Sequence, residues 1–357
     1  MAKLALDTTK TGKQAQDLEK QLRSLVVGQE EAIETIVRAY QSHVTGLSPA
    51  GRPIANLLFL GPTGSGKTRV VEATAQSMLN DPKAVIKIDC AEFQLGHEIA
   101  KLIGSPPGYL GHRETHPMLS QETVNRYHTE KCKISIVLFD EIEKASDTLW
   151  NLLLGILDKG VVTLGDNRKV DFSSSMIFLT SNLGANEMAA LASPRLGFSR
   201  TVADAGFKSG RDAKLSSIGA AAARRKFTPE FINRLDRVVV FRPLGDEDLA
   251  KILDIELDNV EQRLLKASSD TPFLVELDES ARGLLLREGT DARYGARHLK
   301  RAIERLLVQP LSNLMASGQI RRGDYISVSH NEGSSSLMFC REAAAREGWK
   351  RTGAMAA

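Results

Sequence analysis

The chain has 357 residues and a formal net charge of +3, with 42% apolar and 25% charged residues. This composition is typical of a globular protein with room for one large and one smaller domain, and the near balance of charge does not indicate a nucleic-acid partner. No apolar run approaches the ~20 residues of a membrane span, and no signal-peptide pattern opens the chain. Three scattered cysteines predict reduced thiols and a cytoplasmic protein: Cys90, Cys132 and Cys340.

The expected elements begin with a polar stretch, an amphipathic helix, a loop, a buried strand and a second helix. Residues 1–24 form an N-terminal extension that is helical or loose, and an amphipathic helix is expected from there to about residue 43. A loop follows over 46–53. The apolar run 57–60 then predicts a buried strand, and the pattern over 67–79 predicts a helix.

An octapeptide between this strand and this helix fits G-x-x-x-x-G-K-[ST] without a gap. Its glycines allow backbone N–H groups to surround phosphates, and the helix N-terminus adds positive potential. Lys67 can reach the β- and γ-phosphates of ATP, and Thr68 can ligate Mg²⁺. The alternative is a glycine-rich turn without a ligand, but the flanking strand and helix favour a nucleotide. The predicted nucleotide-binding residues are Gly61, Pro62, Thr63, Gly64, Ser65, Gly66, Lys67 and Thr68.

Acidic and amide side chains follow two further apolar strands. The strand over 134–139 is followed by Asp140 and Glu141, and the strand over 176–180 is followed by Asn182. A carboxylate at the carboxyl end of a strand can reach the metal beside the phosphates. We therefore expect Asp140 to ligate Mg²⁺, Glu141 to polarise the attacking water and Asn182 to orient it. The alternative is that the acidic pair caps the next helix.

Alternation of strands and helices predicts an α/β fold with a parallel five-stranded sheet flanked by helices. The five expected strands are 57–60, 84–89, 134–139, 176–180 and 238–241. Residues 192–220 contain Pro, Gly, Ser and mixed charge, and are expected to form a mobile surface loop.

Pro243 follows the last strand and marks a domain boundary. Beyond it, helical patterns cover 246–268 and 278–318, with strands at 324–329 and near 336–341. The expected organisation is an extension over 1–24, a large nucleotide-binding domain over 25–242, a smaller and mostly helical domain over 243–335, and a tail over 336–357.

Seven stretches resemble one module of the Clp chaperone ATPases of the AAA+ class, most closely the C-terminal module of ClpB, ClpA and ClpC. They occur in family order over about 25–330, at residues 26–32, 61–68, 102–111, 137–145, 180–184, 227–236 and 294–297. The resemblance implies an AAA+ P-loop NTPase fold and an ATPase that uses ATP and Mg²⁺. It also implies a protein unfoldase or remodelling chaperone that threads polypeptide through a ring, as a homo-hexamer.

The resemblance assigns three further roles. Arg234 matches the arginine finger that reaches the γ-phosphate in the neighbouring subunit, although the residues alone favour a surface salt bridge through Asp236. Arg297 matches the sensor arginine of the small domain, for which the alternative is one basic residue on a solvated helix face. Tyr109 matches the tyrosine that lines the pore and grips the polypeptide, whereas a lone loop tyrosine is normally a packing anchor.

The partners are less closely specified. Leu196, Gly197 and Phe198 have the form of the apolar-Gly-Phe tripeptide by which some Clp unfoldases dock on a ClpP-type peptidase, and the alternative is that Leu196 and Phe198 pack the loop onto the domain. Substrate choice falls to the pore, the extension, the tail or an adaptor. Two other function classes stay open: a nucleic-acid motor or loader of the wider AAA+ group, for which no DNA-reading signature is found, and a nucleotide-gated scaffold.

Overall fold

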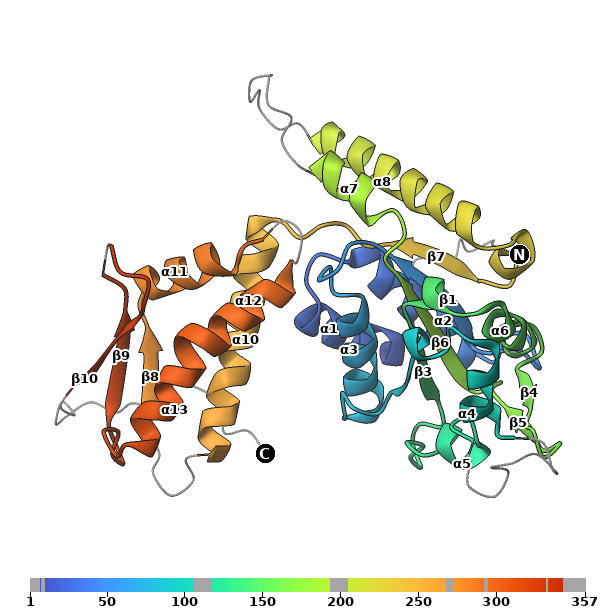
Figure 1. The fold of residues 1–357 in the computed structure, drawn as a ribbon, viewed down its shortest axis with the longest axis horizontal. Helices are drawn as coiled ribbons and strands as arrows, with labels where there is room; N and C mark the ends of the chain where they lie inside the picture. The colour runs from blue at the N-terminus through green and yellow to red at the C-terminus, as the bar shows by residue number, and fades with distance from the viewer. Residues whose placement is uncertain are drawn as a thin grey trace, which may run out of the picture. The chain divides into compact units, whose positions relative to one another are not determined.

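The computed structural model describes residue 7 and residues 10–105, 117–192, 205–267, 273–291, 295–331 and 333–342. The chain divides into two compact units, Met1–Pro243 and Leu244–Ala357, each with its own hydrophobic core. Figure 1 labels most of the helices and strands of both units. Within the described residues, no helix combines the length and the apolarity that a bilayer crossing requires.

A parallel five-stranded sheet forms the centre of the first unit, and the predicted fold class is confirmed. Its order is β2-β3-β6-β1-β7, with every neighbouring pair parallel. All residues of β1 and β6 are buried, as expected where helices cover both faces of a parallel sheet. The strands are β1 (Ala55–Leu60), β2 (Ile86–Asp89), β3 (Ser135–Asp140), β6 (Ser175–Ser181) and β7 (Arg237–Val240).

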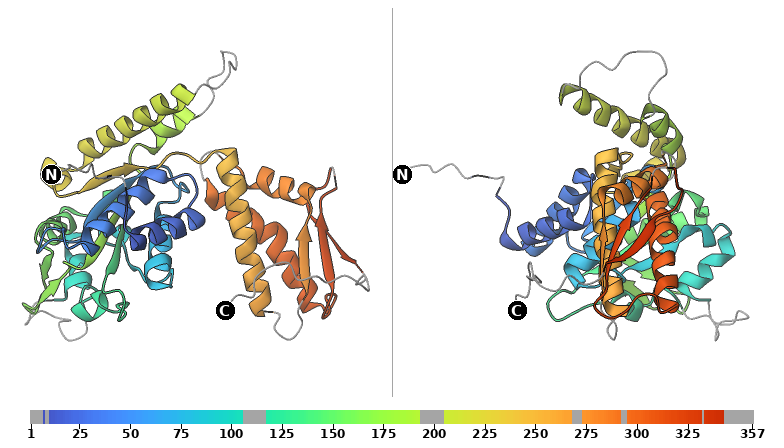
Figure 2. Two further views of the ribbon diagram at one scale, coloured as in Figure 1. Left: turned by 180° about the vertical axis from the view of Figure 1, so that it is seen from behind. Right: turned by 90° about the vertical axis from the view of Figure 1, so that its left-hand side faces the viewer.

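Helices pack on both faces of this sheet (Figures 1 and 2). Helices α1 (Lys13–Leu25), α2 (Glu30–Val44) and α3 (Lys67–Leu79) share one apolar cluster with one face, and α6 (Asp147–Lys159) belongs to the cluster on the other. Part of the extension is therefore helical. The second helix starts several residues later than expected, because the chain turns at Gly28, where φ is 77°.

Short elements connect the larger ones on the second face. They include an antiparallel hairpin of β4 (Val161–Thr163) and β5 (Lys169–Asp171), which the sequence did not predict because three-residue strands carry no clear alternation. The others are η1 (Cys90–Glu92), η2 (Gly96–Ile99), α4 (Ala100–Ile103), α5 (Gln121–Val124), η3 (Ile142–Lys144) and α9 (Pro229–Ile232).

The expectation of a loop over 192–220 is wrong for residues 205–220. They belong to α8 (Ala205–Lys226), which follows α7 (Ala185–Ala192) and packs against β7. Alanine, lysine and arginine favour a helix strongly enough to outweigh the glycines that suggested a loop. One of those glycines has a packing role, since a Cβ on Gly219 would lie 2.6 Å from Cγ2 of Val240.

The second unit is a helical layer beside a small mixed sheet of order β10-β9-β8. Its strands are β8 (Leu274–Leu277), β9 (Tyr325–Ser329) and β10 (Met338–Glu342), with β8 parallel and β10 antiparallel to β9. The sequence missed β8, a short edge strand whose first residue, Leu274, is 45% exposed. The helices are α10 (Asp246–Ala267), α11 (Glu279–Gly289), α12 (Ala296–Ile303), the short π-helix η4 (Glu304–Val308) and α13 (Gln309–Ala316).

Helices α11 and α12 meet at Gly289, which leads to a stability prediction. A Cβ there would lie 2.5 Å from Cδ1 and 2.8 Å from Cα of Leu299, and a backbone atom cannot easily move away. We expect Gly289→Ala to lower the free energy of unfolding by about 1–3 kcal/mol, measured by urea denaturation with circular dichroism. Gly283→Ala on the same helix is the matched control, because nothing lies within 4 Å of its Cβ position. Equal stability of the two variants would contradict the packing argument.

Candidate nucleotide-binding site

The loop between β1 and α3 has the shape of a phosphate cradle. A Cβ on Gly61 would lie 2.7 Å from the carbonyl oxygen of Phe241, so only glycine fits there. Gly66 has φ of 97° and precedes α3 without a side-chain cap. The first N–H groups of α3 are therefore left without an acceptor from a capping side chain, as an anion-binding helix terminus requires.

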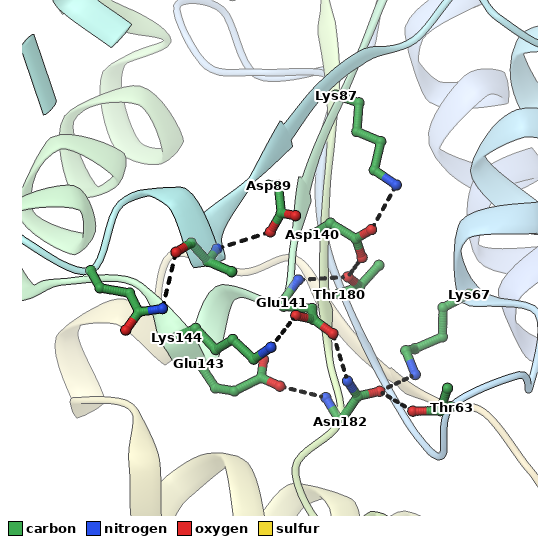
Figure 3. Close-up of polar contacts among 12 residues, drawn as sticks. Thr63, Lys67, Lys87, Asp89, Asp140, Glu141, Glu143, Lys144, Thr180 and Asn182 are labelled. Atoms are coloured by element: carbon green, nitrogen blue, oxygen red, sulfur yellow. Dashed lines mark hydrogen bonds and ion pairs between the residues drawn. The ribbon is translucent and has the colours of Figure 1, made fainter. Parts of the chain in front are cut away.

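Lys67 lies inside this loop and is 9% exposed. Its Nζ donates to the carbonyl oxygens of Gly61 at 2.7 Å and Pro62 at 3.0 Å. It also donates to Oδ1 of Asn182 at 2.9 Å (Figure 3). The hydroxyl of Thr63 also approaches that Oδ1, at 3.5 Å. Two segments far apart in the sequence, the loop and the end of β6, are thus joined around one ammonium group.

Asp140 lies at the end of β3 with both carboxylate oxygens engaged (Figure 3). Oδ1 accepts from the hydroxyl of Thr180, and Oδ2 lies 2.9 Å from Nζ of Lys87 on β2. Burial raises the pKa of Asp140, but the bonds from Thr180 and Lys87 outweigh it and hold the pKa below its ordinary value. The carboxylate is therefore ionised at neutral pH, as a metal ligand must be.

Glu141 has a left-handed backbone conformation, with φ of 57°. A residue other than glycine costs about 1–3 kcal/mol in such a region, and such strain clusters at functional sites. Its N–H donates to the Thr180 hydroxyl at 3.1 Å, and its Oε2 lies 2.5 Å from Nζ of Lys144. Its side chain makes no capping hydrogen bond to η3, so the capping alternative is wrong for Glu141.

Asn182 lies at the centre of the polar network in Figure 3 and contacts three of its charged residues. Besides its contact with Lys67, its Nδ2 points to Oε1 of Glu141 at 3.4 Å, and its backbone N–H donates to Oε1 of Glu143 at 3.1 Å. The structure thus brings the predicted Lys67, Asp140, Glu141 and Asn182 together at the carboxyl ends of the strands. Sequence reasoning assigned no role to Lys87 or Glu143, because their part depends on strand register.

Arg234 lies before β7, at the opposite ends of the strands from the polar network. Its Nη1 donates to the carbonyl oxygen of Glu230 at 3.0 Å, and its Nη2 lies 3.1 Å from Oε1 of Glu230 and 3.9 Å from Oδ2 of Asp158. The ion pair expected through Asp236 is not the one observed, since Asp236 accepts from the N–H of Asn56 at 2.7 Å. The i, i+4 spacing across the one-turn helix α9 explains why Glu230 is the partner.

The other predicted site residues do not belong to this cluster. Arg297 lies in the second unit, exposed, as the second residue of α12. Two basic residues farther along that stretch have acidic partners, Lys300 with Glu256 at 2.9 Å and Arg305 with Glu288 at 3.0 Å. The predicted pore and docking residues lie outside the described residues: Tyr109, Leu196, Gly197 and Phe198.

A family model described as "AAA domain (Cdc48 subfamily)" matches residues 52–238. The chain belongs to the AAA family of ATPases. A second model, described as the C-terminal, D2-small domain of ClpB protein, matches residues 244–328. Together they confirm the resemblance of this AAA chain to a single ATPase module of the Clp type.

Known proteins of the family are similar over most of the chain. The chaperone protein ClpB of Rhizobium meliloti is 38% identical over 330 residues, 92% of this chain and 35% of the relative. ClpB of Meiothermus ruber is 39% identical over 311 residues, 87% of this chain and 34% of the relative. This AAA chain therefore spans about one third of the ClpB proteins that it matches.

A solved structure of Hsp104 with ATPγS and FITC casein in a closed state has the same fold. It superposes with a TM-score of 0.74 and 28% sequence identity, over 92% of this chain and 52% of Hsp104. The likeness extends beyond the P-loop to the greater part of this AAA chain.

Proposed function

We propose that the chain is an ATP-driven protein unfoldase or remodelling chaperone of the Clp family that acts as a ring. The observation that carries the proposal is the division of the site. The phosphate-binding and water-activating residues lie at the carboxyl ends of the strands, and Arg234 lies near their amino ends. The relatives named ClpB and the Hsp104 structure with casein support polypeptide as the substrate class.

Within one subunit, the loop 61–68 would hold the phosphates, and Thr68 with Asp140 would ligate Mg²⁺. The uncapped start of α3 and the ionised carboxylate of Asp140 fit these groups. Mg²⁺, when bound, neutralises charge on the β- and γ-phosphates. Lys67 would turn from the carbonyl oxygens of its own loop toward the phosphates.

Glu141 would then polarise the attacking water, and Asn182 would orient it. Asn182 suits this task because Lys67, Glu141 and Glu143 fix its amide and backbone from three sides. Its amide thereby connects the phosphate-binding lysine to the carboxylate that activates the water. The left-handed backbone of Glu141 supports this role, because such strain is found at sites where a catalytic group is pre-organised.

Arg234 would complete the site of a neighbouring subunit. From Asn56, beside Arg234, to Gly61 the chain runs along β1, and these steps of about 3.3 Å per residue span roughly 16 Å. An arginine side chain cannot bridge that distance along a packed strand, so Arg234 would serve a second copy of the chain. A ring, proposed as a homo-hexamer, gives every subunit such a neighbour. Arg297 would contact nucleotide from the small domain.

Two tests separate this proposal from its alternatives, and the first is ATPase stimulation. We expect a permanently unfolded protein to raise ATPase turnover several-fold, and single- or double-stranded DNA to leave it unchanged, with ring assembly followed by analytical ultracentrifugation. Stimulation by DNA alone would indicate a nucleic-acid motor. Rings stimulated by neither would indicate a nucleotide-gated scaffold.

Tyr109→Ala supplies the second test. We propose that Tyr109 grips the polypeptide, because an aromatic ring between glycines contacts any sequence through its area rather than through specific hydrogen bonds. We expect the variant to retain basal ATPase turnover and to lose unfolding of a tagged fluorescent protein, whereas Tyr109→Phe should retain both. Unchanged unfolding by Tyr109→Ala would argue against threading.

A ClpP-type peptidase or an adaptor is part of the proposal on the strength of the tripeptide alone. Leu196, Gly197 and Phe198 would supply one apolar anchor per subunit for such a partner.

A further inference from the structure

Asn56 is a polar residue inside an otherwise apolar strand. It is the second residue of β1 and is 0% exposed. Its Nδ2 donates to the carbonyl oxygen of Leu157, at 2.9 Å, and to that of Arg234, at 3.2 Å. Its backbone N–H donates to Oδ2 of Asp236 at 2.7 Å, and its carbonyl oxygen accepts from the N–H of Asp236 at 2.9 Å. One residue of β1 therefore holds the segment 234–236 through both its backbone and its side chain.

The amide is not needed to build the strand. Burial of an amide is unfavourable unless its polar atoms are bonded, and Oδ1 of Asn56 is buried without a hydrogen-bond partner. The neighbours of Asn56 along β1 are Ala55 and Leu57, both buried and apolar. An apolar side chain of the same size would avoid the desolvation, so the two bonds from Nδ2 indicate a role in placing their acceptors.

Both acceptors lie beside the Arg234 side chain. One is the backbone of Arg234 itself. The other is Leu157, whose neighbour Asp158 carries a carboxylate 3.9 Å from Nη2 of Arg234. Asn56 thus holds the backbone from which the Arg234 side chain extends. Through Leu157 it also holds the position of Asp158, one of the two acidic residues around the guanidinium.

We infer that Asn56 is the positioning residue of Arg234, an inference that rests on the proposed action of Arg234 in a neighbouring subunit. Because β1 leads directly into the phosphate-binding loop, Asn56 sets the arginine relative to the strand that carries the subunit's own nucleotide site. Loss of the amide would leave the nucleotide site of the same subunit intact, but it would misplace the Arg234 guanidinium that acts in the neighbouring subunit.

Asn56→Leu tests this inference, since leucine has a similar size and no donor. We expect ATP affinity, measured with a fluorescent ATP analogue, to stay within about twofold, and ATPase turnover to fall at least tenfold. Asn56→Ser serves as a second variant, with a shorter polar side chain, should the leucine variant fail to fold. Ser135→Ala is the matched control: Ser135 is also buried near the start of a strand of this sheet, and its hydroxyl donates to the carbonyl oxygen of Val124 at 2.7 Å.

Mixed rings distinguish a positioning role from general damage to β1. Asn56→Leu subunits mixed with Lys67→Ala subunits should regain turnover, because some interfaces then join an intact nucleotide site to a well-placed Arg234. Mixing with Arg234→Ala subunits should restore nothing. The reverse pattern would place the defect in the variant's own nucleotide site and overturn the inference, and so would wild-type turnover of Asn56→Leu.

The same experiment separates the inference from the proposed function. If Arg234→Ala alone has no effect on turnover, the role of Arg234 fails, and the inference fails with it. If Arg234→Ala is defective while Asn56→Leu and Asn56→Ser behave as wild type, only the inference fails.

Discussion

Glu141→Gln is expected to bind ATP normally and to lower its hydrolysis by about 10²–10⁴-fold. The amide keeps the size of the side chain and its contact with Asn182, but it cannot accept a proton from the attacking water. Lys67→Ala is expected to abolish nucleotide binding instead, because the loop loses the buried ammonium group that would face the phosphates. The two variants should therefore fail at different steps of one reaction.

Equilibrium binding of a fluorescent ATP analogue and steady-state phosphate release distinguish these two failures. Glu122→Gln is a suitable control, because Glu122 is an exposed carboxylate on α5 in the same unit. It should match the wild type in both measurements. Turnover near the wild-type level in Glu141→Gln would show that another group activates the water.

Arg234→Ala is expected to keep ATP affinity nearly intact and to lower turnover by roughly 10³-fold, the lower end of the effect of an arginine finger in other NTPases. The binding residues lie at the other end of β1 and remain unchanged. Arg237→Ala provides the matched control, since Arg237 lies three residues after Arg234, at the start of β7, with a side chain that is 59% exposed. Its turnover should stay within about twofold of the wild type.

Mixtures of Arg234→Ala with Lys67→Ala test whether the arginine acts between subunits. Each variant alone is nearly inactive, but a mixed ring contains some interfaces with one intact nucleotide site and one intact arginine. Turnover should therefore rise and pass through a maximum as the ratio of the two variants is varied. Absence of rescue at every ratio, in rings shown to be mixed, would argue against action in a neighbouring subunit.

The nucleotide site could be predicted from the sequence because its topology is simple. Parallel strands bring their carboxyl ends to one edge of the sheet, so residues after three separate strands had to meet there. The parts contributed by Lys87 and Glu143 could not be foreseen. Each depends on which strands are neighbours and in what register, as in the pairing of Lys87 with Leu138 across β2 and β3.

Other misses have local causes. The glycines and serines of 205–220 suggested a loop, but the helix there gains from packing against β7, where Gly219 permits close approach to Val240. The partner of Arg234 was misassigned to Asp236, because the one-turn helix that brings Glu230 beneath the guanidinium is too short to show a periodic pattern. Short elements are decided by their neighbours more than by their own residues.

The strand β1 connects the phosphate-binding loop to the segment that carries Arg234 and keeps the distance between them fixed. Gly61 at its carboxyl end opens the phosphate-binding loop, and Asn56 near its amino end holds the segment of Arg234. A fully buried strand between two paired neighbours has little freedom to stretch or slide. In a ring of such subunits, the offset from each site to the arginine given to the next would be constant. Differences between sites in the rate of ATP hydrolysis would then arise at the interfaces between subunits. The sheet itself would transmit each displacement without loss.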